Sequence, residues 1–293
     1  MLKRKKIDLR IREMRPADLE ALMQIKNAEN WNQTEEDWLF LIKNNPKFCL
    51  VAESENKLIG TVTAMKYQQK LAWIGMMLVA KKYRGLGVSK ILLNTIIKRL
   101  DKCDSIKLDA TPAGVPVYKK LGFIAEYDIQ RMVCSGLPVE IMDQEDTGAF
   151  EISNILAGDI SKLMPLDKMI FGVQRSELFY YLLNNKKDIG FQIKLGNHLK
   201  GFVFGRKGSN HLQVGPLLAD SVQSAKWLLN CVLNSVRGKS LMVDVLSDQQ
   251  EFKEWLLFKK FKYERSFTRM YLKTNNYSGN KENQFLISGP ELG

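Results

Sequence analysis

Two glycines separated by one residue, in a basic stretch, form the part of this sequence best suited to hold an anion. The turn comprises Arg84, Gly85, Leu86, Gly87, Val88 and Ser89. It opens a helical pattern over residues 88–100, whose first amides have no intrahelical partner and lie at the positive end of the helix dipole. Glycines there let an anion approach the backbone, which predicts a diphosphate site. The spacing alone is weak, because the Rossmann and Walker patterns are both absent and an ordinary turn fits nearly as well.

The elements that must position this turn form an α/β pattern. Strands are predicted at 7–13, 48–54, 57–67, 71–79, 106–110 and 123–133, from alternating or continuous apolar runs between polar turns. Helices are predicted after the Pro16-Ala17-Asp18 start, in a stretch opened by "NQTEEDW", over 88–100 and in a stretch begun by "TPAG". In the second of these, Asn32 or Thr34 can cap the helix, and Glu35 and Glu36 favour its first turn. We therefore expect a mixed, mostly antiparallel sheet flanked by helices.

The second half of the chain repeats the first in order. Gly60 matches Gly201, Gly75 matches Gly215 and Asp109 matches Asp244. "VYKKLGFIAEYDIQRMV" returns as "LFKKFKYERSFTRMYL", with Phe258 in the place of Tyr118. This order predicts a duplicated domain: a first domain at 1–136, a linker at 137–150, a second domain at 151–275 and a tail at 276–293. The polar composition from residue 274 predicts disorder in this tail before a short apolar end.

Composition narrows the function classes. The chain of 293 residues has a net charge of +12, which attracts anionic partners, but it lacks a basic patch interleaved with aromatics and a helix-turn-helix signal. We therefore do not expect a nucleic-acid partner. No segment has the apolar length of a membrane span or the h-region of a signal peptide, so no membrane partner and a cytoplasmic location are expected. The four scattered cysteines predict neither disulfides nor a metal site, and both histidines lie in the second half.

Residues 7–133 resemble the GCN5-related N-acetyltransferases (GNAT superfamily). Their motif A, [QR]-x-x-G-x-[GA], here begins at Lys82 and ends at Gly87. Lys82 departs from the motif but keeps the charge. The second half, with "LDKMIFGVQRSEL" at 166–178, is similar to the additional C-terminal domain of bacterial tandem members.

This resemblance implies acetyl-CoA as cosubstrate and no metal. It implies that the fourth and fifth strands splay apart and that the pantetheine arm pairs with the backbone of Met77, Leu78 and Val79. The diphosphate would rest on the amides of residues 84–89, with Arg84 or Lys82 nearby.

The resemblance also implies that Tyr118 gives a proton to the departing thiolate, although a tyrosine here could be plain core. An amide near Leu78 would stabilise the oxyanion. The identity of the general base is left unassigned, because the fourth strand has no carboxylate. Asp109 is a candidate, but its repetition as Asp244 favours a structural role at least as much. Glu53 is a weaker candidate, and a water chain could also serve.

The function predicted is N-acetylation of an amine whose identity the sequence does not give. The alternative is a noncatalytic acyl-CoA-binding sensor on the same fold. The second copy has "SVQSAKW" where the first has the glycine turn, so we expect it to lack this chemistry. Asp167 and Arg175 are interpreted there as a surface ion pair. Oligomeric state is not predicted.

Overall fold

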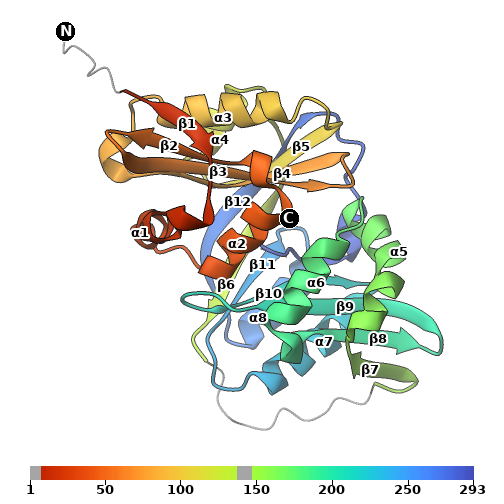
Figure 1. The fold of residues 1–293 in the computed structure, drawn as a ribbon. Helices are drawn as coiled ribbons and strands as arrows, with labels where there is room; N and C mark the ends of the chain where they lie inside the picture. The colour runs from red at the N-terminus through yellow and green to blue at the C-terminus, as the bar shows by residue number, and fades with distance from the viewer. Residues whose placement is uncertain (1–7, 137–146) are drawn as a thin grey trace.

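One continuous sheet runs through the molecule and joins two halves (Figure 1). The computed structural model describes residues 8–136 and 147–293. Ile7 and residues 137–146, most of the expected linker, lie outside the described residues. The strand order is β1-β2-β3-β4-β5-β12-β6-β11-β13-β10-β9-β8-β7. The mixed, mostly antiparallel sheet predicted from the sequence is confirmed.

Elements of the first half follow the predicted order. Its strands are β1 (Arg10–Glu13), β2 (Cys49–Ser54), β3 (Lys57–Tyr67), β4 (Leu71–Val79), β5 (Ser105–Ala110) and β6 (Ile124–Cys134). Its α-helices are α1 (Leu19–Asn27), α2 (Glu35–Asn44), α3 (Val88–Arg99) and α4 (Val115–Lys119). Helix α2 begins as the sequence indicates, because the Thr34 side chain accepts from the Asp37 amide and the Asp37 carboxylate accepts from the Thr34 amide.

The second half repeats this order. Its strands are β7 (Phe150–Asn154), β8 (Phe191–Leu195), β9 (His198–Arg206), β10 (Leu212–Ala219), β11 (Leu241–Leu246), β12 (Lys262–Lys273) and β13 (Gln284–Leu286). Its α-helices are α5 (Ile160–Phe171), α6 (Ser176–Asn185), α7 (Val222–Ser235) and α8 (Gln250–Phe258). Asp109 in β5 and Asp244 in β11 occupy equivalent strands, as the predicted duplication requires.

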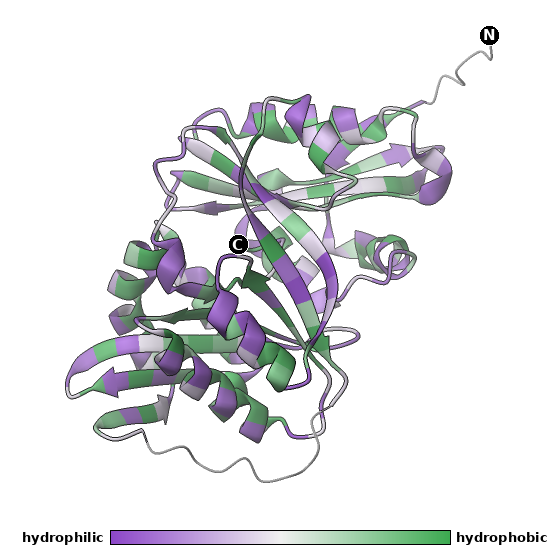
Figure 2. Ribbon diagram, turned by 180° about the vertical axis from the view of Figure 1, so that it is seen from behind, coloured by the Kyte–Doolittle hydropathy of each residue, from purple (hydrophilic) through white to green (hydrophobic). Residues whose placement is uncertain are grey.

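Three apolar cores hold the helices against the sheet. The buried side of α3, which includes Leu92 and Ile96, packs on the strands of the first half. Helices α7 and α8 cover the strands of the second half through Leu228 and Phe252. A third core contains residues of α1, α2, α5 and α6 together. The two halves therefore share a core, and the hydropathy colouring shows apolar residues along the central strands (Figure 2).

The halves also exchange their long last strands. Strand β12 of the second half lies between β5 and β6, and β6 of the first half pairs with β11. Two buried ion pairs accompany the exchange: Arg269 Nε and Nη2 donate to the Asp109 carboxylate at 2.9 and 3.0 Å. Reciprocally, Arg131 Nε and Nη2 donate to Asp244 at 2.8 and 2.9 Å. Each copy thus supplies the arginine that neutralises the other copy's buried aspartate.

The predicted disorder of the tail is wrong. Strand β13 enters the sheet between β10 and β11, where Leu286 lies opposite Leu217 and Val245. Phe285, Leu286, Ile287 and Leu292 are all buried. The polar composition of residues 274–283 concealed this apolar end, which fills a gap in the second half. Gly293, the last residue of the sequence, lies in the middle of the molecule (Figure 1).

The interpretation of Asp167 and Arg175 as a surface ion pair is also wrong. Arg175 Nη2 donates to Asp167 Oδ1 at 2.7 Å, and neither side chain is exposed. The guanidinium also lies 3.6 Å from the centre of the Phe171 ring and donates to the Gly293 carbonyl at 2.9 Å. Arg175 therefore joins α5 and α6 to the tail, which lies too far away in the sequence for pattern alone to bring it there.

Candidate active site

The tip of α3 has the features of the predicted anion site. Gly85 and Gly87 have φ of 76° and 86°, in the left-handed region where glycine carries no Cβ penalty. A Cβ at either position would meet no atom within 4 Å, so the space above the backbone is open. The Ile91 amide donates to the Gly87 carbonyl at 3.1 Å and starts the helical ladder. The amides of residues 88–90, ahead of it, are those that a helix leaves unpaired.

The two basic side chains predicted near the diphosphate, Arg84 and Lys82, lie in different environments. Arg84 Nε donates to the Val79 carbonyl at 3.0 Å, and Arg84 Nη2 lies 2.7 Å from the Glu29 carboxylate. Lys82 is exposed, with its ammonium 5.7 Å from the centre of the Tyr83 ring. Arg84 therefore bridges the end of β4 and the start of the turn, while Lys82 stays in solvent.

The predicted splay of β4 from β5 is present. The two strands pair in parallel only from Leu71 to Trp73, and β4 continues to Val79 without β5 beside it. A bulge lies within this free segment, with Met76 at φ 50° and its carbonyl accepting from the Thr61 hydroxyl at 2.6 Å. The bulge turns the end of β4 away from β5, and an extended ligand could pair with the edge that this exposes.

Peptide groups at the end of β4 alternate between β3 and the open edge. The Ala80 amide donates to the Ile59 carbonyl of β3. Because successive residues of a strand alternate in direction, Leu78 also directs its amide toward β3, and Met77 and Val79 direct theirs toward the splay. A donor to an oxyanion in the splay would therefore come from Met77 or Val79 rather than from Leu78.

Two adjoining cavities follow the splay. The outer cavity, of about 420 Å³, extends from Glu29, Arg84 and Ser89 at the α3 tip along β4. The inner cavity, of about 110 Å³, is bounded by β4, β5, β12 and the tail. Five residues line both cavities: Trp31, Met77, Thr111, Tyr118 and Arg265. The second half thus provides part of the wall.

Tyr118 stands where the cavities meet. It lies on α4, half-buried, with its ring 5.8 Å from that of Phe123 in an edge-to-face contact. The ring is also against Gly114, where a Cβ would come 3.0 Å from Tyr118 Cε2. Burial raises the pKa of the Tyr118 hydroxyl to about 12. The phenol is therefore protonated at neutral pH and placed at the junction, as a proton donor requires.

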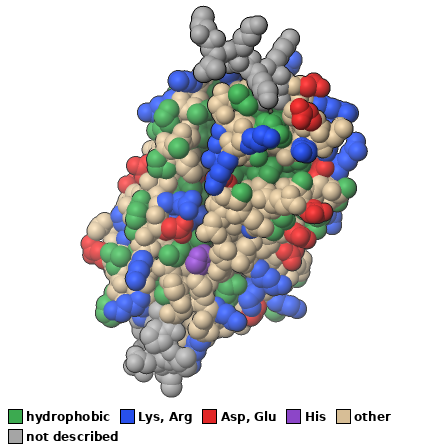
Figure 3. Space-filling model, turned by 90° about the vertical axis from the view of Figure 1, so that its left-hand side faces the viewer, with side chains coloured by type: hydrophobic (Ala, Val, Ile, Leu, Met, Phe, Trp, Pro, Cys, Tyr) green, Lys and Arg blue, Asp and Glu red, His purple; other side chains and the backbone are tan. Residues whose placement is uncertain are grey.

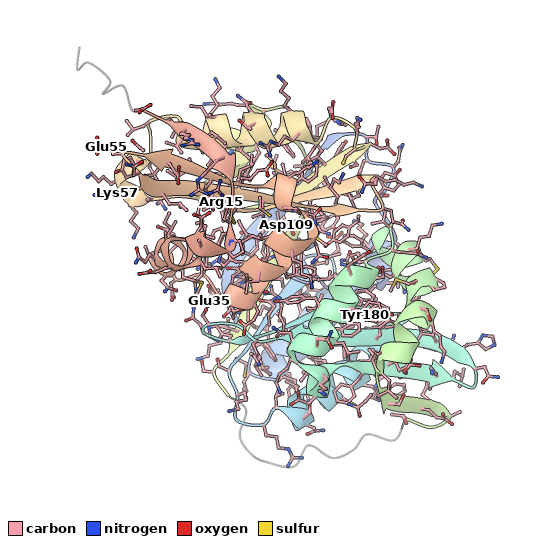
Figure 4. The ribbon with its side chains drawn as sticks, in the orientation of Figure 1. Arg15, Glu35, Glu55, Lys57, Asp109 and Tyr180 are labelled. Carbon is pink, nitrogen blue, oxygen red and sulfur yellow. The ribbon has the colours of Figure 1, made fainter. Side chains whose placement is uncertain are left out.

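The candidate bases are both engaged in ion pairs. Asp109 lines the inner cavity and lies in the interior between the halves (Figure 4). Burial raises the pKa of Asp109, and the guanidinium of Arg269 opposes this shift while occupying both carboxylate oxygens. Glu53 accepts from Arg12 Nε at 2.8 Å, on β2 and outside both cavities. The geometry assigns Asp109 a structural ion pair and separates Glu53 from the site.

Within residues 147–293, the described part of the second half, the connection from β10 to α7 has no glycine turn like that at the α3 tip. Only Asp220 and Ser221 separate β10 from α7, and Ser221 Oγ accepts from the Ser224 amide at 3.2 Å as the helix cap. Asp220 adds a negative charge where an anion would bind. Strand β13 occupies the gap between β10 and β11, and Phe258 is 74% exposed. In this copy a short turn capped by Ser221 stands in the place of the glycine turn, and β13 fills the gap beside it.

Sequence reasoning missed the residues that the tail and loops bring to the inner cavity. These are Gln33 from the turn before α2, Arg265 and Phe267 from β12, and Pro290 and Glu291 from the tail. No motif marks them, because they come from three distant segments. The net positive charge of the chain did not help to locate the site, because the basic side chains on the face shown in Figure 3 are scattered among acidic and apolar ones.

Two family models match the chain. Residues 11–123 match "Acetyltransferase (GNAT) family", and residues 163–286 match "Acetyltransferase (GNAT) domain". Within residues 8–136 and 147–293, no helix is long and apolar enough to cross a membrane. Across the same ranges, no group of His, Cys, Asp or Glu side chains is arranged to hold a metal ion.

Relatives cover nearly the whole chain. A protein of Pseudoalteromonas sp. named holothin acyltransferase is 27% identical over 95% of this chain and 94% of its own. The uncharacterized N-acetyltransferase YitH of Bacillus subtilis is 22% identical over 80% of this chain and 82% of its own. A putative acetyltransferase structure from Pyrococcus horikoshii superposes with a TM-score of 0.81 at 22% identity, covering 100% of this chain and 99% of that one.

Proposed function

The chain belongs to the GNAT superfamily and is an N-acyltransferase of the tandem type, and we propose that it uses acetyl-CoA to acetylate a primary amine. One observation carries the proposal. The open turn at the α3 tip, the free edge of β4 and the Tyr118 hydroxyl all border one connected pair of cavities. This arrangement combines an anion site, a strand edge and a proton donor along a path suited to an extended thioester.

Acetyl-CoA would bind in the first half alone. The diphosphate would accept hydrogen bonds from the amides at the α3 tip. The Arg84 guanidinium would leave the Glu29 carboxylate and pair with the diphosphate instead. The pantetheine arm would lie along Met77 and Val79, whose peptide groups face the splay. In the second half β13 and Asp220 occupy the corresponding places, so one acetyl-CoA per chain is expected.

Transfer then needs no metal. The neutral amine attacks the thioester carbon, a C–N bond forms, and the carbonyl oxygen takes up the negative charge. A β4 amide facing the splay, from Met77 or Val79, would stabilise this oxyanion. When the intermediate collapses the C–S bond breaks, and Tyr118 protonates the leaving thiolate. The products are an N-acetylated amine and CoA–SH.

A small-molecule amine is the proposed acceptor class. The relative whose name specifies holothin acylation aligns over 95% of this chain. Relatives named as N-alpha-acetyltransferases align over 29% and 31% of it. The inner cavity, of about 110 Å³, is small and partly walled by the second half, which favours a compact acceptor over a peptide.

A panel of amines tests the proposal, with free thiol measured after mixing the protein and acetyl-CoA. Amine-dependent thiol release is expected for wild type. Titration calorimetry should give one acetyl-CoA per chain, and binding should be severely weakened in Gly87→Gln. The matched control is Gly196→Gln, since Gly196 also has positive φ and open space but lies on the β8–β9 hairpin. Acetyl-CoA binding without turnover of any amine would favour a sensor instead, and unchanged affinity in Gly87→Gln would rule out the cradle.

A further inference from the structure

We propose that Glu291, carried to β4 by the tail, is the carboxylate that accepts the amine proton, and that Gln33 beside it orients the amine. This inference rests on the proposed function and assigns the acceptor subsite of the same active site. The first half has no carboxylate on β4 to serve as base, and its nearest candidate, Asp109, is paired on both oxygens with an arginine that serves no other carboxylate among the described residues, Arg269. The structure shows which segment brings another carboxylate there.

The path of the tail explains how Glu291 reaches the site. After β13 fills the gap in the second half, the chain turns at Gly289, whose φ is 126°, and continues through Pro290 along β4. A Cβ on Gly75 would lie 2.6 Å from Glu291 Cα, so the strand accepts the tail only because this position is glycine. Trp73 Nε1 and the Tyr67 hydroxyl hold the tail on either side, donating to the Pro290 and Leu292 carbonyls at 3.0 and 2.7 Å.

The Glu291 carboxylate is held firmly and still has capacity to accept. Arg206 Nη2 pairs with Oε1, and Gln33 Nε2 donates to Oε2 at 2.9 Å. A carboxylate has about four acceptor sites, so these donors leave room for a ligand N–H. The side chain is 2% exposed and belongs to the wall of the inner cavity, which Tyr118 also lines. The carboxylate is buried and borders the cavity that the proposed acid also lines.

Gln33 gives a second, independent indication that the ligand of this cavity carries hydrogen-bond donors. It is 6% exposed and lines the same cavity, and its Oε1 has no hydrogen-bond partner. Its orientation is set by Nε2, because exchanging the two atoms would place an oxygen against the carboxylate of Glu291. A buried acceptor without a donor is costly, so the site favours a ligand carrying N–H groups. A primary amine has enough of them to reach both Gln33 Oε1 and Glu291.

The charges around the cavity leave Glu291 less neutralised than its neighbours. Asp109 and Asp244 each have an arginine of their own. Arg206 is shared between Glu291 and Asp37, and the Tyr181 hydroxyl also donates to Asp37 at 2.8 Å. Lys26 Nζ donates to the Ser209 hydroxyl and makes no ion pair with either carboxylate. Arg265 is paired with Glu264 at 2.9 Å. One guanidinium thus serves two buried carboxylates.

The proton balance follows from this placement. As the amine nitrogen attacks the thioester carbon, it becomes positively charged, and one N–H proton passes to Glu291. Collapse of the intermediate breaks the C–S bond, and the thiolate takes the Tyr118 proton. Transfer of the proton from Glu291 to the tyrosinate, through solvent, restores both groups. The net reaction is amine plus acetyl-CoA giving amide plus CoA–SH.

The test compares Glu291→Gln with Asp37→Asn in the full chain. Both changes remove one of the two carboxylates on Arg206, but Asp37 is not part of the cavity wall. Glu291→Gln should lower kcat about 10²-fold or more, within the range for loss of a general base, with acetyl-CoA affinity unchanged. Asp37→Asn should lower thermal stability and leave kcat per folded molecule within a few-fold of wild type.

The amine's own basicity supplies a readout that a structural role does not move. A weakly basic arylamine gives an intermediate that loses its proton to water readily, so Glu291→Gln should slow it less than a strongly basic alkylamine. Gln33→Met, which keeps the Glu291 charge, should raise KM for the amine with little change in kcat. Equal losses for both amine classes, or equal kinetic losses in Asp37→Asn, would overturn the assignment. A wild type inactive with every amine would instead refute the proposed function itself.

Discussion

Replacing Asp109 by asparagine tests whether this aspartate is structural. The change removes the negative charge that faces the guanidinium of Arg269 and leaves a nearly isosteric amide. Arg269 is 2% exposed and would stay buried with no carboxylate in contact. Breaking one side of a buried ion pair costs about 3–5 kcal/mol of unfolding free energy.

The aromatic rings around Arg269 place the expected loss of unfolding free energy toward the lower end of that range. The Arg269 guanidinium lies 4.4 Å from the centre of the Trp73 ring and 5.0 Å from that of Tyr127. These contacts persist in the variant and are worth about 1–2 kcal/mol when desolvated. The side-chain oxygen of the introduced asparagine can also still accept one hydrogen bond from Arg269. We therefore expect Asp109→Asn to lose about 3 kcal/mol.

The duplication provides a matched control in Asp244→Asn. Asp244 neutralises Arg131 in the same way, and it also accepts from Gln213 Nε2 at 3.1 Å, so its loss should be about 3–5 kcal/mol. Urea unfolding measures both variants, and one cooperative transition is expected because the halves exchange strands. Turnover per folded molecule should fall similarly in the two variants. A 100-fold fall confined to Asp109→Asn, with intact folding, would refute the structural role and make Asp109 the base.

Three further predictions concern the reaction and the tail. Tyr118→Phe should lower kcat roughly 10²-fold or more in steady-state assays and leave acetyl-CoA affinity unchanged; equal turnover would remove Tyr118 from the mechanism. A proton donor loses its proton, and with it its function, as the pH rises through its pKa. Because the pKa of the Tyr118 hydroxyl is about 12, the rate should not fall as the pH is raised to ~10. A fall in rate near neutral pH would contradict the role of Tyr118 as the proton donor. Gly75→Ala should displace the tail, since its Cβ would come 2.6 Å from Glu291 Cα, lowering both the melting temperature and amine turnover; an unchanged variant would show that the contact is dispensable.

The sequence predicted the local elements well because their signals are local. The glycine turn, the capped start of α2 and the apolar runs of β2 to β5 each depend on neighbouring residues. The repeated order of motifs predicted the duplication, and the missing glycines in the second copy predicted the loss of its anion site. These features need no knowledge of which strand pairs with which.

The features that depend on long-range pairing were not predictable in this way. Strand β12 matches β6 in pattern, and nothing in either strand specifies that it inserts beside β5. The burial of Asp167 with Arg175 depends on the tail, whose own burial was hidden by the polar residues before it. Glu291 and Gln33 lie 258 positions apart in the sequence and meet only in the folded chain. The acceptor side of the site is therefore a product of the tertiary fold.

A crystal structure of the protein with coenzyme A would show whether the α3 tip and the splay of β4 and β5 form the cofactor site. We expect one molecule per chain, with its diphosphate on the amides at the start of α3 and its thiol near the Tyr118 hydroxyl. Coenzyme A bound at the Ser221 end of α7, or bound away from the splay of β4 and β5, would contradict this expectation.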